Sequence, residues 1–135
     1  MKILLDTHIL LWFHIDRAKL SQKAWDIMLD PQNEVYFSAV NIWETQIKHM
    51  RNPAAMPVSG DVLQEASVRS GMRALHVKPE HAFPLKTLSY SDRAPRAHKD
   101  PFDRMLICQA KAENMLLLTH DELLPYYNEA CVVAV

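Results

Sequence analysis

Short apolar runs that each stop at a polar residue are the feature that most constrains this chain. Residues 2–5 form one such run, which ends at Asp6, and residues 114–119 form another, which Asp121 follows closely. Runs of this length between helical segments are typical of parallel strands that are buried on both faces of a sheet. Three further runs predict strands in the same way: residues 34–37, 72–77 and 131–135.

Capping residues and stop signals predict helices between these runs. Asp6 or Thr7 can cap the first helix, and Asp100 followed by Pro101 is a combination typical of a helix start. In the helix that Ser38 caps, apolar residues recur at spacings of three and four and predict one apolar stripe, formed by Val40, Trp43, Ile47 and Met50. The expected helices cover about residues 7–15, 22–29, 39–51, 60–70, 79–88, 101–114 and 121–127.

Strands that alternate with helices predict an α/β fold with a mostly parallel sheet covered on both faces. With 135 residues, of which 49% are hydrophobic, the chain is expected to form one domain over residues 1–135. No apolar run approaches the length of a membrane span, and the N-terminus lacks the cleavage site of a signal peptide. We therefore expect a cytoplasmic protein with no membrane partner.

Composition excludes several classes of site. Gly60 and Gly71 are the only glycines, so the chain cannot contain a phosphate-binding glycine-rich loop or a G-x-S-x-G nucleophile turn. Cys108 and Cys131 are too few for a disulfide scaffold or a four-cysteine zinc site, and both are expected to be buried thiols. A net charge of -1 argues against broad, sequence-blind wrapping of nucleic acid, although it allows a local basic patch.

Four acidic residues are predicted to meet at one edge of the sheet. Asp6 ends the first strand, and Asp121 follows the strand that ends at residue 119, so both belong to the carboxyl edge, where open α/β sheets bind ligands. Glu44 lies six residues into the helix that Ser38 begins. Asp103 lies in the first turn of the helix that starts after residue 100, on the face that turns toward the core.

Carboxylates that converge in this way need a cation, because like charges a few ångströms apart oppose one another's ionisation. Oxygen ligands without a nearby thiolate favour Mg²⁺ or Mn²⁺ over Zn²⁺. Such sites polarise phosphoryl oxygens and lower the pKa of a bound water. The chemistry that the acids indicate is metal-assisted hydrolysis of a phosphodiester.

Each acid also has a simpler interpretation. Asp103 is at the third position of its helix, where an acid also suits the helix dipole. Asp6, Asp100 and Asp121 are all placed where a side chain can cap a helix. Glu44 can form an ordinary exposed ion pair with Lys48, four residues later. The shared edge is therefore the stronger argument, and it depends on the predicted strands.

Other polar and aromatic residues give weaker signals. Thr7 and Thr119 are most simply caps, but either can hydrogen-bond an acid or a metal-bound water. Trp12, Trp25 and Trp43 lie at helical positions and are more typical of core residues than of base-stacking platforms. A basic cluster close to the last helix start is a candidate for contacts with a phosphate backbone: Arg93, Arg96, His98, Lys99 and Arg104.

Four motifs, taken together and in order, resemble those of PIN-domain proteins, and most closely the VapC-type toxins of bacterial toxin–antitoxin pairs. They are LLDTH at residues 4–8, SAVNIWE at 38–44, HKDPFDR at 98–104 and LTHD at 118–121. HKDPFDR is the most specific, and the resemblance covers nearly the whole chain apart from residues 51–60, which we could not match.

The resemblance implies a three-layer α/β/α domain with a central sheet of about five strands. It also implies an endoribonuclease that depends on Mg²⁺ or Mn²⁺ and cuts single-stranded or looped RNA, leaving a 5′-phosphate and a 3′-hydroxyl. The implied partners are a small cognate antitoxin and a second copy of the chain, with which it would form a homodimer. By motif position, the catalytic and metal-binding acids are Asp6, Glu44, Asp103 and Asp121, supported by Thr7, Thr119 and Asp100.

Two alternatives from other classes stay open. A catalytically silent module of the same fold would bind nucleic acid or an antitoxin but show no metal-dependent cleavage. A receiver-like phosphoacceptor domain would need an aspartate at the end of an internal strand, whereas the strand predicted at residues 34–37 is followed by Ser38.

Overall fold

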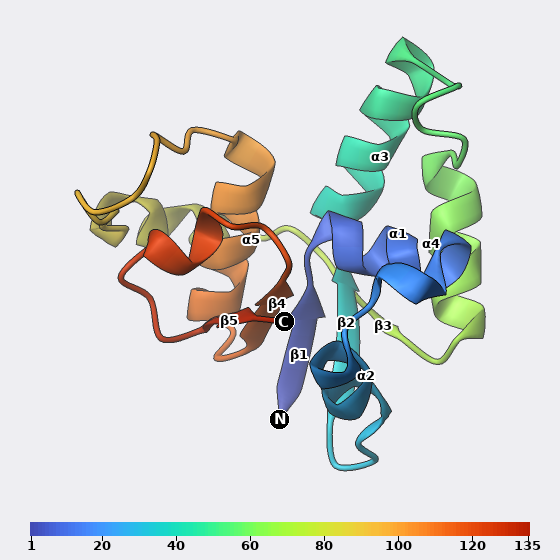
Figure 1. Cartoon of the computed structure of the whole chain (residues 1–135), viewed down its shortest axis with the longest axis horizontal. Coiled ribbons are helices and arrows are strands. Elements are labelled where there is room, and N and C mark those ends of the chain that lie inside the picture. The colour runs from blue at the N-terminus through green and yellow to red at the C-terminus, as the bar shows by residue number, and fades with distance from the viewer.

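The computed structural model describes residues 1–135, and a five-stranded sheet lies at its centre. All neighbouring strands run parallel, in the order β3-β2-β1-β4-β5 (Figure 1). The central strand β1 (Lys2–Leu5) lies between β2 (Glu34–Ser38) and β4 (Leu116–Thr119), and β3 (Arg73–Leu75) and β5 (Val132–Ala134) form the edges. The predicted strands are confirmed, and the sheet is parallel throughout.

Helical segments connect the strands, and most begin where the caps predicted. The helix expected at residues 121–127 is wrong in extent: only a 3₁₀-helix forms at Leu124–Tyr126, and it ends because Tyr127 is extended and pairs with Tyr90. The segment at residues 79–88 is a 3₁₀-helix with Pro84 inside it. In chain order the segments are α1 (Thr7–Ile15), η1 (Arg17–Lys19), α2 (Gln22–Leu29), α3 (Ala39–Arg51), α4 (Gly60–Arg69), η2 (Pro79–Thr87), α5 (Pro101–Ala112) and η3 (Leu124–Tyr126).

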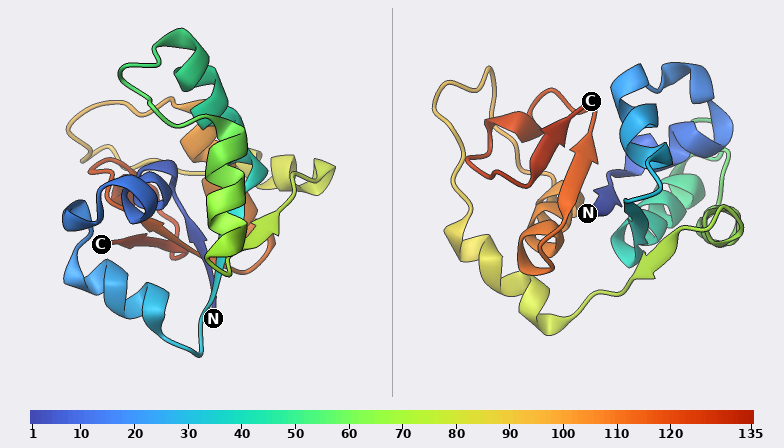
Figure 2. Two further views of the ribbon diagram at one scale, coloured as in Figure 1. Left: turned by 90° about the vertical axis from the view of Figure 1, so that its right-hand side faces the viewer. Right: turned by 90° about the horizontal axis from the view of Figure 1, so that it is seen from below.

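The sheet separates two hydrophobic cores. Leu5 and Phe37 face a core completed by α1, α2 and α4, whereas Leu4 and Leu117 face a core completed mainly by α5. Figure 2 shows α1 and α2 on one side of the sheet and α5 on the other. The expected α/β/α layering is therefore confirmed. None of the helices combines the length and the apolar character that a membrane crossing requires.

The apolar stripe predicted for α3 is wrong for two of its four residues, because Val40 is buried and Ile47 half-buried but the other two are exposed. Trp43 and Met50 are 63% and 73% exposed, while Asn41, Glu44 and Thr45 are buried. The reason is that the first half of α3 packs over the carboxyl end of β1, where main-chain groups need polar partners: the Asn41 side-chain amide donates to the last carbonyl of that strand at 3.2 Å. The helix consequently turns a polar face inward, toward the edge where the acids were predicted.

Candidate functional site

The four predicted acids come from four different elements at the carboxyl edge of the sheet. Asp6 directly follows β1, Asp121 follows β4, Glu44 belongs to α3 and Asp103 to the first turn of α5. Asp6 and Glu44 are each only 3% exposed. The negative charges of Glu44, Asp6 and Asp121 all raise the pKa of Asp103, so the four carboxyl groups act on a common region.

Asp6 has a structural contact at each oxygen. Its Oδ1 accepts the main-chain N–H of Ile9 at 2.9 Å and so caps α1, while its Oδ2 accepts the Thr119 hydroxyl. Burial raises the pKa of Asp6 although both hydrogen bonds oppose this shift. The Thr119 Oγ1 also accepts the N–H of Asp121 at 3.0 Å. Thr119 therefore joins two of the acids.

Glu44 is held by a short chain of polar contacts. The Asn41 amide donates to Thr7 Oγ1 at 3.0 Å, and Thr7 in turn donates to Glu44 Oε1 at 2.6 Å. Lys48 forms the predicted ion pair with the other oxygen of Glu44, but the carboxylate is buried, so this is not the exposed pair of the simpler interpretation. Sequence reasoning missed Asn41, although its spacing from Ser38 is that of a capping box, which the structure contains.

Asp103 has a strongly perturbed carboxyl group. Burial is the largest cause, followed by the charges of Asp100, Glu44, Asp6 and Asp121, and together they raise its pKa to about 8. His98 Nε2 lies 3.1 Å from Asp103 Oδ2. The sequence assigned His98 to a basic cluster that could contact a phosphate backbone, yet its side chain is only 5% exposed.

The other nitrogen of the His98 ring, Nδ1, lies 2.8 Å from the hydroxyl of Tyr127. Burial lowers the pKa of this imidazole, against the negative charges of Asp121 and Asp100. The pairing was not visible in the sequence, because Tyr127 lies 29 residues away from His98 in the chain.

Asp100 is the helix cap that the simpler interpretation predicted, whereas Asp121 holds the turn before η3, a helix that has no side-chain cap. Asp100 Oδ1 accepts the N–H groups of Phe102 and Asp103 at 2.8 and 3.1 Å. Asp121 Oδ1 accepts those of Leu123 and Leu124 at 2.7 and 3.3 Å. These contacts leave the second oxygen of each carboxylate free to accept another ligand.

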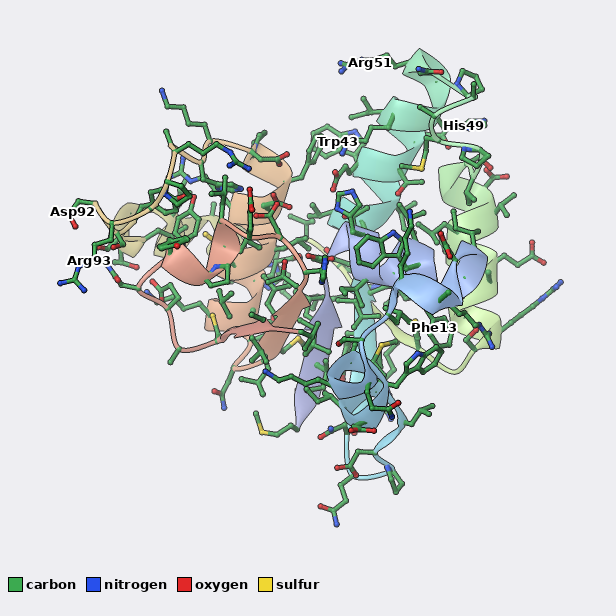
Figure 3. The ribbon with its side chains drawn as sticks, viewed as in Figure 1. Phe13, Trp43, His49, Arg51, Asp92 and Arg93 are labelled. Carbon is green, nitrogen blue, oxygen red and sulfur yellow. The ribbon has the colours of Figure 1, made fainter.

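The predicted basic cluster does not form a single patch. Arg96 is paired with Glu122, and Arg93 points outward at the tip of its loop, beside Asp92 (Figure 3). Lys99 is exposed. Arg104 directly follows Asp103 in the chain, and its Nε is buried without a hydrogen-bond partner.

The donor set fits a hard divalent cation by its chemistry. The four carboxyl groups and the hydroxyls of Thr7 and Thr119 supply oxygen donors in this region, and a cation would relieve the mutual repulsion of the carboxylates. His98 and Lys48 also contact two of these carboxyl groups. No three histidine, cysteine, aspartate or glutamate side chains are already close enough together to hold a metal ion. The two largest hollows flank Trp43 and contain none of the four acids, whereas Asp121 lines a smaller pocket of 200 Å³.

Comparison with known proteins gives a consistent result. A sequence model of the PIN domain matches residues 3–129. VapBC2 from Rickettsia felis, solved bound to a DNA fragment from its promoter, covers 100% of this chain and 98% of its own, with a TM-score of 0.66 and 13% identity.

Two other solved structures are similar to this chain, each at 17% identity. VapBC-1 from nontypeable Haemophilus influenzae covers 90% of this chain and 87% of its own, with a TM-score of 0.57. The match to a toxin–antitoxin complex from Klebsiella pneumoniae covers 97% of this chain and 95% of the chain in that complex, with a TM-score of 0.56. At such identities the likeness shows a shared fold. Among curated protein sequences there is no match.

Proposed function

The chain belongs to the PIN-domain family, and on this premise we propose that it is a divalent-metal-dependent endoribonuclease, the toxin of a toxin–antitoxin pair. PIN domains are generally nucleases. The observation that carries the proposal is the convergence of four carboxyl groups, from four different elements, at the carboxyl edge of the sheet, where the charges of Glu44, Asp6 and Asp121 add to burial in raising the pKa of Asp103. A group of buried acids that oppose one another's ionisation is unfavourable in a purely structural role, but suits a cation site.

We assign metal binding to Asp6 and Asp103, with Glu44 and Asp121 completing the site directly or through water. When bound, Mg²⁺ or Mn²⁺ would supply Lewis acidity toward a phosphodiester. The residues of the chain itself hold the carboxylates in place: Thr119 fixes Asp6, and the other threonine of the site, Thr7, fixes Glu44. Such preorganisation lets a site stabilise charge without rearranging during the reaction.

We assign Asp100 a positioning role, because it caps α5 and so orients the turn that carries Asp103. Arg104 is the best candidate for an RNA phosphate contact, because it directly follows Asp103 in the chain and forms no ion pair with another side chain. Lys99, Arg93 and Arg96 would add weaker contacts along the backbone of the RNA.

The proposed partners are an RNA substrate, a small cognate antitoxin and a second copy of the chain. The solved structures similar to this chain include a toxin–antitoxin complex, and this supports the proposal of an antitoxin partner. We also propose that residues 1–135 form a single PIN-like domain, because the family match spans residues 3–129. The two unpaired cysteines are consistent with action in the cytoplasm.

A catalytically silent module is the second candidate. It is favoured by one observation, namely that no three acidic or histidine side chains are already grouped closely enough to hold a metal ion. Such a module would bind RNA or an antitoxin through the same surface without cutting RNA.

A cleavage assay separates the two candidates. Purified wild type, Asp103→Asn and a matched control, Asp92→Asn at the exposed loop tip, would each receive total RNA with Mg²⁺, Mn²⁺ or a chelator. We expect discrete, metal-dependent fragments from the wild type and the control, and none from Asp103→Asn. Full cleavage by Asp103→Asn, or equal cleavage in chelator, would overturn the proposal.

A further inference from the structure

A small pocket opens directly beside the acids. It has a volume of 200 Å³ and is lined by His8, Trp12, His120 and Asp121. His8 lies close enough to Asp6 for its charge to lower the pKa of that carboxyl group. The pocket therefore shares Asp121 with the proposed cation site and lies next to Asp6.

Three aromatic rings form the walls of this pocket. The Trp12 ring centroid lies 5.8 Å from that of His8 and 5.1 Å from that of His120, with which it makes an edge-to-face contact at 68°. His120 Nδ1 lies 2.9 Å from the carbonyl oxygen of Val135, which fixes the imidazole in place. Lys19 Nζ lies 5.8 Å from the Trp12 ring, so a positive charge is near as well.

We propose that this pocket binds one unpaired nucleobase of a single-stranded RNA, next to the phosphate that is cut. The inference rests on the proposed nuclease function and adds a subsite to it. Aromatic rings stack with any base, and a base can enter such a pocket only when it is not paired in a duplex. Trp12, which the sequence predicted to be a core residue, is only partly buried and has this second role.

Trp43 is a less suitable platform, although it is more exposed. Its ring packs edge-on against Phe102 at 5.5 Å and points from α3 toward α5 (Figure 3). The hollows on either side of Trp43 contain none of the four acids. A base bound there would have no fixed relation to the phosphate at the acidic site, so Trp43 provides a matched control.

Binding without cleavage tests the subsite. A labelled single-stranded RNA and an abasic oligonucleotide of the same length would be titrated in chelator against wild type, Trp12→Leu, Trp12→Phe, His120→Ala and Trp43→Phe. The wild type should prefer the RNA over the abasic strand by about tenfold, the scale of one stacked base. His120→Ala and Trp12→Leu should lose most of this preference, whereas Trp12→Phe, which keeps a ring, and Trp43→Phe should retain it.

A spectroscopic measurement reports on Trp12 itself. In a Trp25→Phe/Trp43→Phe variant Trp12 is the only indole left, and its fluorescence should be quenched by the RNA but not by the abasic strand. Because Trp12 also packs against the core and Trp12→Leu can impair folding, His120→Ala, at an exposed position, is the decisive variant. An unchanged preference in His120→Ala, or an equal loss in Trp43→Phe, would overturn the subsite. These results do not depend on cleavage, so a failed nuclease assay is distinguishable from a failed subsite.

Discussion

Replacing Asp103 with asparagine is predicted to stabilise the metal-free protein. The pKa of this carboxyl group is about 8 in the folded chain, compared with 3.8 for the unperturbed group. The unfolded state therefore loses its proton at a lower pH than the folded state, and stability falls as the pH rises from about 4 to about 8. A pKa difference of this size corresponds to on the order of 5 kcal/mol.

Asparagine has nearly the same shape and cannot ionise. We therefore expect Asp103→Asn to raise the free energy of unfolding by several kcal/mol at pH 8, and by less than about 1 kcal/mol at pH 4. Urea denaturation in chelator at the two pH values measures this directly. Asp92→Asn, at an exposed position, should change stability at neither pH.

Added Mn²⁺ should make the wild type more stable than Asp103→Asn at pH 8, the reverse of the order expected in chelator. A cation that binds the ionised carboxylates stabilises the wild type by mass action, whereas the variant lacks one ligand and gains less. If Asp103→Asn is no more stable than the wild type at pH 8 in chelator, the carboxyl groups do not oppose one another in the folded chain and the reasoning about the site is refuted.

Two further substitutions test how the site is supported. Asn41→Ala should lower the free energy of unfolding by about 3 kcal/mol, because a buried main-chain carbonyl and a buried hydroxyl lose their partner. Trp43→Ala, on the exposed side of the same helix, should lower it by less than about 1 kcal/mol, and thermal unfolding of the two variants measures the difference. Gly60→Ala would place a Cβ 2.9 Å from the carbonyl oxygen of Ile42 and should lower the free energy of unfolding by about 1–3 kcal/mol, as measured by chemical denaturation. An unchanged denaturation midpoint would show that α3 and α4 can move apart without cost.

The order of strands and helices was predictable because local signals determine it. The run before Asp6 and the run before Asp121 are short and apolar, and both form interior strands of the sheet. The orientation of α3 was not predictable in the same way. Its apolar spacing favours a buried side with Trp43 and Met50, but the end of β1 requires polar partners, and this tertiary requirement prevails.

The site could be predicted only at the level of its acids. Asp6 and Asp121 follow strands, so topology alone assigns them to one edge. The contacts that hold the acids are long-range: Thr119 meets Asp6 across 113 residues of chain, and Tyr127 meets His98 across 29. Pairings of this kind leave no periodicity in the sequence, so the contacts of Asn41 with Leu5 and Thr7 and of His98 with Tyr127 were recognised only in the structure.

Calorimetric titration with Mn²⁺ tests the central claim most directly, namely that the buried acids form a divalent-cation site. Wild type, Asp6→Asn, Asp103→Asn and Asp92→Asn would be compared at equal protein concentration, without nucleic acid. The account predicts saturable binding to the wild type and to Asp92→Asn, and strongly weakened binding to the other two variants. A wild type that binds no Mn²⁺, or variants at Asp6 and Asp103 that bind it equally well, would contradict the account.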